Sequence, residues 1–344
     1  MAISYPIPKW DRPAPTSYDL NWADLTELPL DLFDTPEGKA ELVKRVKHAL
    51  EVEDLGFCID AKNGGYLGYR AAYERTINGT DVLDNMELLN VPKYTKDFAD
   101  TPRHEIIKAH EAEISDFHRR CWYDVARKLF ILFALALELP ENYFVDRHDY
   151  EKVSQDHLRY MMYHPRSEED DAKCNNLWSW AHTDYGSLTL LFSQTVSGLQ
   201  VKFADGTYRD IKPKKGSIVV NVADTLSFMT KGYLRSTIHR VTRPPPDQAH
   251  IHRIGVLYGC RPNDDVPVVV APSPLLDRLG YLTPEDKLAD EKNAVTAGEY
   301  VAARVKAVHG ANTYGNAPGT KFKHGNLEVL ENFGEVKNGS GVSI

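Results

Sequence analysis

Apolar residues recur at helical spacing in two stretches of the first half of the chain. The first begins at Thr35, a typical helix cap, and Pro36, which is favoured in a first turn, and its apolar stripe runs through residues 42–50. The second extends from about residue 102 to 139, keeps one side apolar and stops before Pro140. We expect such a long helix to lie against a large apolar surface, because propensity alone stabilises helices weakly in water.

The other parts of the first hundred residues have no helical period. Residues 1–20 contain four prolines and predict an extended arm. Residues 55–59 form a short apolar run that predicts a strand. Residues 60–100 are rich in Gly, Asn, Asp and Tyr, so we expect an irregular connection lying on the surface.

From residue 157 onward the pattern changes to short β-rich runs separated by turn residues. These runs are residues 158–164, 188–192, 199–203, 217–221, 226–228, 236–241 and 253–258. Asp205-Gly206 is a strong hairpin signal between two of them. The spacing predicts an antiparallel double sheet of the jelly-roll kind, within an α+β fold that has a mainly β core.

The chain is expected to divide into three parts. Residues 1–150 predict an N-terminal helical or mixed region that packs on the core. Residues 151–310 predict the jelly-roll core and a C-terminal helix at about 296–308. Residues 311–344 are rich in Gly, Asn and Lys and predict a loosely ordered tail.

Composition narrows the class of protein. The 344 residues are 42% hydrophobic, enough for a sizeable core, and the net charge of −8 gives no basic excess for nucleic acid. No apolar run reaches the roughly 20 residues of a membrane span, and the start of the chain does not resemble a secretory signal. None of the four cysteines has C-x-x-C spacing, so a structural zinc site is not expected. So few cysteines in a long chain favour free thiols in a reducing compartment, and a cytoplasmic protein is expected.

The most informative residues are His182-Thr183-Asp184 and the distant His239. Side chains alternate along a strand, so His182 and Asp184 are expected to share one face, and a neighbouring strand would bring His239 to them. Two neutral imidazoles and one carboxylate suit Fe(II) and leave three coordination positions open. An isolated H-x-D occurs often by chance, so the longer strings around it decide its meaning.

Those strings resemble the isopenicillin N synthase-like branch of the Fe(II)/2-oxoglutarate-dependent dioxygenases. They are AHTDYGSLTLL (181–191), GLQV (198–201), PKKGSIVVNVAD (213–224), RSTIHRV (235–241), RIG (253–255) and RP (261–262). The resemblance runs from about residue 24 to 305 and is strong in 157–262.

This resemblance implies a distorted double-stranded β-helix flanked by helices, with Fe(II), 2-oxoglutarate and O2 as cofactor and cosubstrates. It implies that His182, Asp184 and His239 are the catalytic iron ligands, and that Arg253 grips the far carboxylate of 2-oxoglutarate. A guanidinium suits that role because it binds a carboxylate through two parallel hydrogen bonds and stays charged.

Two departures concern cosubstrate binding. The family usually has Arg-x-Ser, whose hydroxyl also holds 2-oxoglutarate, whereas this chain has Gly255. Counting back from Pro165, His164 takes the place of a tyrosine that usually contacts the cosubstrate. His164 is therefore expected either to act as a substitute donor or to be an ordinary histidine at a strand end.

The resemblance implies oxidation of a C–H bond by hydroxylation, desaturation or ring rearrangement, with release of succinate and CO2. A small molecule of secondary metabolism is the expected substrate, by family analogy alone. The candidate contacts are Tyr66, Arg159, Met162, Trp180, Phe228 and Arg235. Aromatic residues in this set are also typical of a core, and arginines are commonly solvated.

Three alternatives stay open from the sequence. An oxidase of the same fold would draw its electrons from the substrate and need no 2-oxoglutarate, which Gly255 permits. A non-catalytic binding module would keep the fold without binding iron. Zinc hydrolysis is weaker, because the sequence offers no evident general base beside the metal residues. The oligomeric state is not readable from the sequence.

Overall fold

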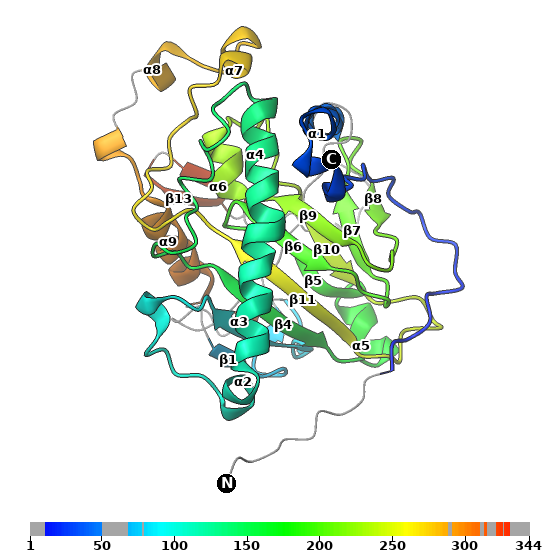
Figure 1. Ribbon diagram of the computed structural model, residues 1–344. Helices are drawn as coiled ribbons and strands as arrows, with labels where there is room; N and C mark the ends of the chain where they lie inside the picture. The colour runs from blue at the N-terminus through cyan, green and yellow to red at the C-terminus, as the bar shows by residue number, and fades with distance from the viewer. Residues whose placement is uncertain are drawn as a thin grey trace.

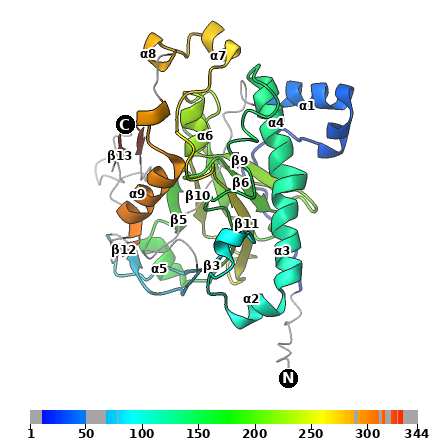
Figure 2. The ribbon, with the colours of Figure 1, turned by 60° about the vertical axis from the view of Figure 1, so that its left-hand side comes forward.

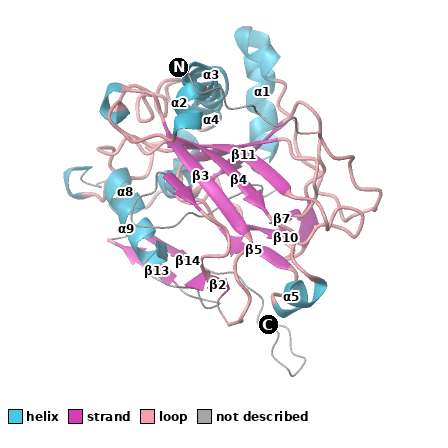
Figure 3. Ribbon diagram, turned by 90° about the horizontal axis from the view of Figure 1, so that it is seen from below, coloured by secondary structure: helices cyan, strands magenta, loops and turns pink. Residues whose placement is uncertain are grey.

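Two antiparallel sheets form the centre of the protein. The computed structural model describes residues 11–49, 68–77, 79–287, 291–309, 313–314, 321–325 and 327–330. The larger sheet has the order β1 (Gly68–Arg70), β3 (Met86–Pro92), β4 (His157–Tyr163), β11 (Arg253–Cys260), β6 (Leu188–Phe192) and β9 (Ile218–Val222). The smaller has the order β5 (Leu177–His182), β10 (His239–Thr242), β7 (Leu199–Lys202) and β8 (Tyr208–Asp210). Figure 3 shows the two sheets as separate layers, which confirms the jelly-roll prediction.

Two small sheets lie outside this centre. They pair β2 (Thr76–Ile77) with β12 (Thr313–Tyr314) and β13 (Lys321–His324) with β14 (Leu327–Leu330). The hairpin of β13 and β14 shows that part of the predicted loose tail has regular structure.

Helices cover the outer face of the larger sheet. They are η1 (Leu30–Asp34), α1 (Pro36–His48), η3 (Lys96–Phe98), α2 (Glu105–Ala109), α3 (Glu111–Arg120), the π-helical η4 (Cys121–Ala126) and α4 (Arg127–Ala136). Figures 1 and 2 show α3 and α4 as one rod across the sheet. Phe130 and Leu132 of α4 are fully buried, as expected for a helix stabilised by packing. The predicted long helix is interrupted at His110 and contains the π segment.

The remaining helices lie between the strands and near the C-terminus. They are α5 (Glu168–Lys173), α6 (Asp224–Met229), α7 (Pro274–Arg278), α8 (Pro284–Lys287), η5 (Glu291–Asn293) and α9 (Ala297–His309). The prediction of α9 is confirmed within one residue. Thr35 caps α1 as expected, since its side chain accepts a hydrogen bond from the Gly38 amide.

Two local predictions are wrong. Residues 226–228 lie in α6 rather than in a strand, because three apolar residues fit either period and Asp224 supplies a good helix start. Residues 60–100 are not simply irregular, since β3 lies inside the larger sheet with Met86 and Leu88 buried. The predicted strand at 55–59 lies outside the described residues.

Strand β3 also means that the central sheet takes residues from both sides of position 150. Cys121, Cys174 and Cys260 are buried free thiols, and Cys58 lies outside the described residues. In the described part of the chain, no helix is long and apolar enough to cross a membrane.

Candidate active site

The first and second histidines of the predicted metal set lie side by side. His182 ends β5 and His239 begins β10, and the two are direct partners in the antiparallel ladder. Their ring centroids are 4.6 Å apart. His239 is fully buried, while His182 is half-buried. The long sequence separation between the two histidines is thus closed by one pair of neighbouring strands.

Backbone carbonyls orient both rings in the same way. Nδ1 of His182 contacts the carbonyl oxygen of Trp180, and Nδ1 of His239 lies 3.3 Å from that of Thr237. A carbonyl can only accept, so each Nδ1 carries a proton and Nε2 is the nitrogen that remains for a metal ion. Burial, and then the neighbouring His182, lower the pKa of His239 well below its usual value. This neutral tautomer is the one that binds metal ions through Nε2.

Asp184 is held differently from the two histidines. Strand β5 ends at His182, so the expected alternation of faces does not continue to Asp184. Its Oδ2 accepts hydrogen bonds from the Thr189 hydroxyl and, at 3.4 Å, from Asn221. Among the residues that the structure describes, no three His, Cys, Asp or Glu side chains form a metal-binding group. The donor types fit Fe(II), but the carboxylate must turn from Thr189 to complete the set.

A buried carboxylate, Asp224, links the segments that carry these residues. It begins α6, and its amide donates to the carbonyl oxygen of Asp184 at 2.8 Å. The hydroxyl groups of Thr183 and Ser236, beside the two histidine segments, act to lower its pKa. From α9, Tyr300 donates at 3.1 Å and Arg304 lies 3.7 Å away. Burial raises the pKa of Asp224, although Arg304 opposes this.

Arg253 is a buried cation without an acidic neighbour in the described part of the chain. It begins β11, opposite Tyr163 of β4, and its guanidinium lies 5.6 Å from the Tyr163 ring centroid. Only 2% of the residue is exposed, and neither Nε nor Nη1 has a hydrogen-bond partner among the described residues. Burial lowers the pKa of Arg253 to about 10, so it stays charged at neutral pH. A buried charge in this state is costly unless an anion joins it.

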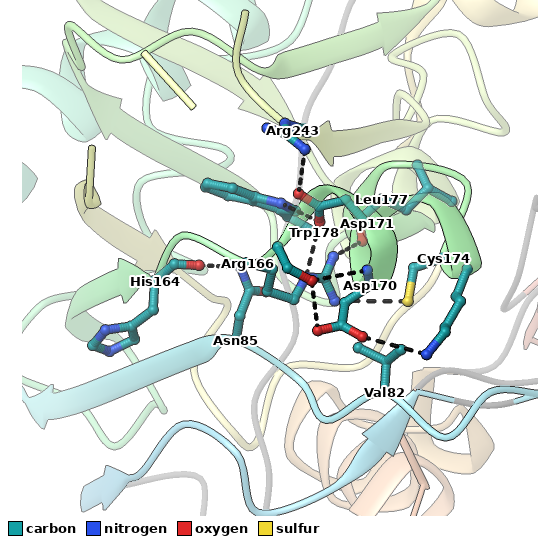
Figure 4. A network of polar contacts seen from close by, with 12 residues as sticks. Val82, Asn85, His164, Arg166, Asp170, Asp171, Cys174, Leu177, Trp178 and Arg243 are labelled. Carbon is teal, nitrogen blue, oxygen red and sulfur yellow. Dashed lines mark hydrogen bonds and ion pairs between the residues drawn. The ribbon is translucent and has the colours of Figure 1, made fainter. Parts of the chain in front are cut away.

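The structure places Tyr163, rather than His164, against this guanidinium. His164 follows the end of β4, and its Nε2 lies 3.5 Å from Glu87. Its carbonyl accepts from Asn85 at 2.6 Å (Figure 4). His164 thus lies at the end of β4 beside Glu87, and its role as a donor to the cosubstrate stays a prediction. The pairing register of β4 with β11, which cannot be read from the sequence, places Tyr163 opposite Arg253.

The predicted substrate contacts do not form one group. Arg159 is buried and its Nε donates to Asn90 at 2.8 Å. Phe228 packs on Tyr300, with ring centroids 5.4 Å apart. Arg235 is exposed on the surface.

Trp180 and Met162 are half-buried on strands that lead toward the site. The backbone of Trp180 orients His182, so its side chain lies on a strand that carries a predicted metal ligand. Tyr66 lies outside the described residues.

Comparison with known proteins finds a family that matches the central part of the chain. Residues 154–262 match the sequence model described as the 2OG-Fe(II) oxygenase superfamily, and this range includes both histidines, Asp184 and Arg253. This segment of the chain is similar to the 2OG-Fe(II) oxygenase superfamily. The family uses Fe(II), 2-oxoglutarate and O2, as the sequence resemblance implied.

Two curated relatives illustrate the match. A UPF0676 protein of Schizosaccharomyces pombe is 31% identical over 214 residues, covering 59% of each chain. The 2-oxoglutarate-dependent dioxygenase citB of Monascus ruber is 31% identical over 196 residues, covering 55% of this chain and 54% of its own. The oxygenase chain thus spans a little over half the length of these relatives.

A solved structure supports the fold. A full-length Neurospora crassa protein, crystallised in complex with alpha-KG, superimposes with a TM-score of 0.64. The match covers 81% of this chain and 95% of that one at 21% sequence identity. This similarity shows a shared oxygenase fold.

Proposed function

We propose that the protein is an Fe(II)- and 2-oxoglutarate-dependent dioxygenase that oxidises a C–H bond of a small molecule. The observation that carries this proposal is that two adjacent imidazoles, those of His182 and His239, and a buried Arg253, whose Nε and Nη1 have no partner among the described residues, occur in one oxygenase fold. The first suits a metal ion and the second suits a carboxylate ligand.

The residues would divide the work as follows. Nε2 of His182, Nε2 of His239 and the carboxylate of Asp184 would hold the iron. When bound, Fe(II) supplies activation of O2 coupled to decarboxylation of 2-oxoglutarate, with release of succinate and CO2. Arg253 would neutralise the far carboxylate of the cosubstrate and fix its orientation, while the buried Tyr163 ring closes the other side of the guanidinium.

Asp184 would change partners when iron binds. Hydrogen bonds from Thr189 and Asn221 reach its Oδ2 in the interior. Coordination to a divalent ion replaces these bonds with a stronger interaction, so the turn is favourable.

The substrate class follows from the relatives by analogy. The name of citB describes a 2-oxoglutarate-dependent dioxygenase of a fungus, and we propose a secondary metabolite as substrate here. Hydroxylation, desaturation and ring rearrangement are all within the proposed chemistry. Three buried free thiols favour a reducing compartment, so we also propose a cytoplasmic location.

An oxidase that does not use 2-oxoglutarate is the second candidate. Gly255 favours it, because the family's serine hydroxyl is missing there. The buried Arg253 charge needs a carboxylate partner, which 2-oxoglutarate supplies and which such an oxidase would have to find on its substrate. Stoichiometric succinate release distinguishes the two candidates.

The test measures O2 uptake and succinate with Fe(II) and 2-oxoglutarate, using wild type, His239→Ala and the exposed His252→Ala as control. We expect the His239 variant to lose iron binding and uptake, and the control to keep both. Uptake that survives His239→Ala would reject the assignment of the metal site.

A further inference from the structure

Gln194 has a buried side-chain amide that the surrounding protein leaves unsatisfied. The residue follows β6, and neither its Nε2 nor its Oε1 has a hydrogen-bond partner among the described residues. Buried side-chain amides are usually bonded, because each unsatisfied polar atom costs free energy. An amide that stays unsatisfied on both atoms is therefore poised for a ligand or water.

The amide occupies space that a missing side chain leaves open. Gly255 lies two residues after Arg253 on β11, so both positions face the same side of the sheet. A Cβ added to Gly255 would overlap Nε2 of Gln194 and lie 3.0 Å from Cγ of Met161. The glycine thus allows the amide to reach this face of β11.

Gln194 and Arg253 also line one cavity. Its volume is about 20 Å³, room for about one water-sized group. Both residues contribute polar atoms that lack partners in the described part of the chain, and Gln194 lies against Gly255, two residues after Arg253 on β11. The described residues that line this cavity include no carboxylate side chain, so donors on its polar side are able to face an anion.

We propose that Gln194 replaces the family's serine hydroxyl as the second donor to the far carboxylate of 2-oxoglutarate. Arg253 supplies the charge, and the Gln194 amide donates one further hydrogen bond to the same carboxylate. The amide reaches the ligand from the β6 side, through the space that Gly255 leaves. This inference rests on the proposed function and explains how a chain without the serine can still bind the cosubstrate.

The test measures the dissociation constant of 2-oxoglutarate by calorimetry, without O2, on protein loaded with Fe(II). Gln194→Ala removes one neutral donor, so binding should weaken about tenfold. Gln194→Glu should weaken it more, because a carboxylate would repel the ligand. Gln200→Ala is the matched control, since Gln200 lies on β7 against Asp210 and Arg240, and it should bind as wild type does.

A double variant separates a donor from a packing residue. In Gln194→Ala/Gly255→Ser, the serine hydroxyl can take the vacated place, and Met161 needs to give by only a few tenths of an ångström. We expect this variant to recover affinity to within about threefold of wild type. Melting curves of all variants confirm that each is folded.

The outcomes separate this inference from the proposed function. If the wild type binds 2-oxoglutarate and Gln194→Ala binds it equally well, the role of Gln194 is overturned while the dioxygenase assignment stands. Weakened binding without recovery in the double variant also overturns it, because a donor role predicts replacement by the hydroxyl. Absence of 2-oxoglutarate binding in iron-loaded wild type overturns the proposed function itself.

Discussion

Two buried arginines of this protein have opposite surroundings. Beside α5, Arg166 donates from Nε to Asp171 at 2.9 Å, and Trp178 donates to the same oxygen at 2.9 Å (Figure 4). Arg243 approaches the other oxygen of that carboxylate at 3.5 Å. On β11, Arg253 has no acidic partner, and two of its guanidinium nitrogens have no hydrogen bond, among the described residues.

Burial alone does not distinguish these sites, because the Arg166 side chain is 4% exposed and Arg253 is 2% exposed. The difference lies in how completely the guanidinium is satisfied, since Arg166 donates to Asp171 and also to the Leu177 carbonyl. A buried cation whose donors are already bonded has little capacity left for a ligand and serves the fold. A buried cation with open donors costs free energy until an anion binds, so it indicates a binding site.

The largest expected effect follows from removing Asp171, the carboxylate that pairs with Arg166. Asp171→Ala leaves Arg166 buried without its counter-ion, and we expect the free energy of unfolding to fall by about 3–5 kcal/mol. Urea unfolding measures the loss. Glu168→Ala is the control, because Glu168 is largely exposed and pairs at the surface with Arg243. A loss below about 1 kcal/mol for Asp171→Ala, the size expected of a surface pair, would show that the network is not structural.

Removing the charge of Arg253 should weaken ligand binding and leave stability nearly unchanged. Arg253→Met is expected to weaken 2-oxoglutarate binding by about 100-fold, roughly 3 kcal/mol, because the far carboxylate loses its charged partner. The free energy of unfolding should stay within about 1 kcal/mol of wild type or rise, since an unsatisfied buried charge is removed. Calorimetry and urea unfolding test the two halves separately. Strong destabilisation with intact binding would reverse the comparison.

Buried histidines provide a third case, in which burial keeps the group neutral. His148 bonds the Phe144 carbonyl at 2.6 Å and Ser187 at 2.7 Å, and burial lowers its pKa to about 3. Between about pH 6.5 and 3, His148 is therefore protonated in the unfolded chain but not in the folded chain. Stability is lost as pH falls through this window, by about 2 kcal/mol per such histidine between about pH 8 and pH 5.

The variant His148→Gln tests this contribution. It should lose some stability at about pH 8, but its further loss on going to about pH 5 should be about 2 kcal/mol smaller than that of wild type. Unfolding curves at both pH values give the difference. His118, whose pKa burial also lowers to about 3, remains as an internal reference in both proteins. An unchanged pH dependence would mean that His148 is not the group responsible.

Residue spacing in the sequence suggests some candidate site residues, whereas others depend on local geometry that spacing does not show. The period of two along a strand and the order of the family strings singled out His182, His239 and Arg253, and the structure pairs the two histidines on neighbouring strands. Asp184 was expected on the same face as His182, but the strand ends first, and strand ends are local geometry that a pattern does not show.

Partners from distant segments explain the rest. The network of Arg166 and Asp171 looks like a solvated acidic helix in the sequence, because nothing there shows that Trp178 packs over it. Gln194 was missed for a similar reason, since its amide matters only beside Gly255, 61 positions later. Tyr163 needed the pairing of β4 with β11.

The smallest expected effect concerns Asp224, which lies close to the metal residues and whose Oδ2 has two partners on α9. If satisfied partners mark a structural group, then changes there should alter the fold and leave ligand affinity nearly unchanged. Tyr300→Phe removes one hydrogen bond to Asp224 from α9, while Arg304 remains 3.7 Å away. We expect a loss of about 1 kcal/mol in the free energy of unfolding.

Affinity for Fe(II) and for 2-oxoglutarate decides between the two views in this variant. A structural role predicts dissociation constants within about twofold of wild type at a temperature where both proteins are folded. A tenfold loss of iron affinity would instead mean that α9 positions the metal segments through Asp224. Asp224 would then resemble Arg253 in function despite resembling Arg166 in its hydrogen bonds, and completeness of partners would no longer separate binding groups from structural ones.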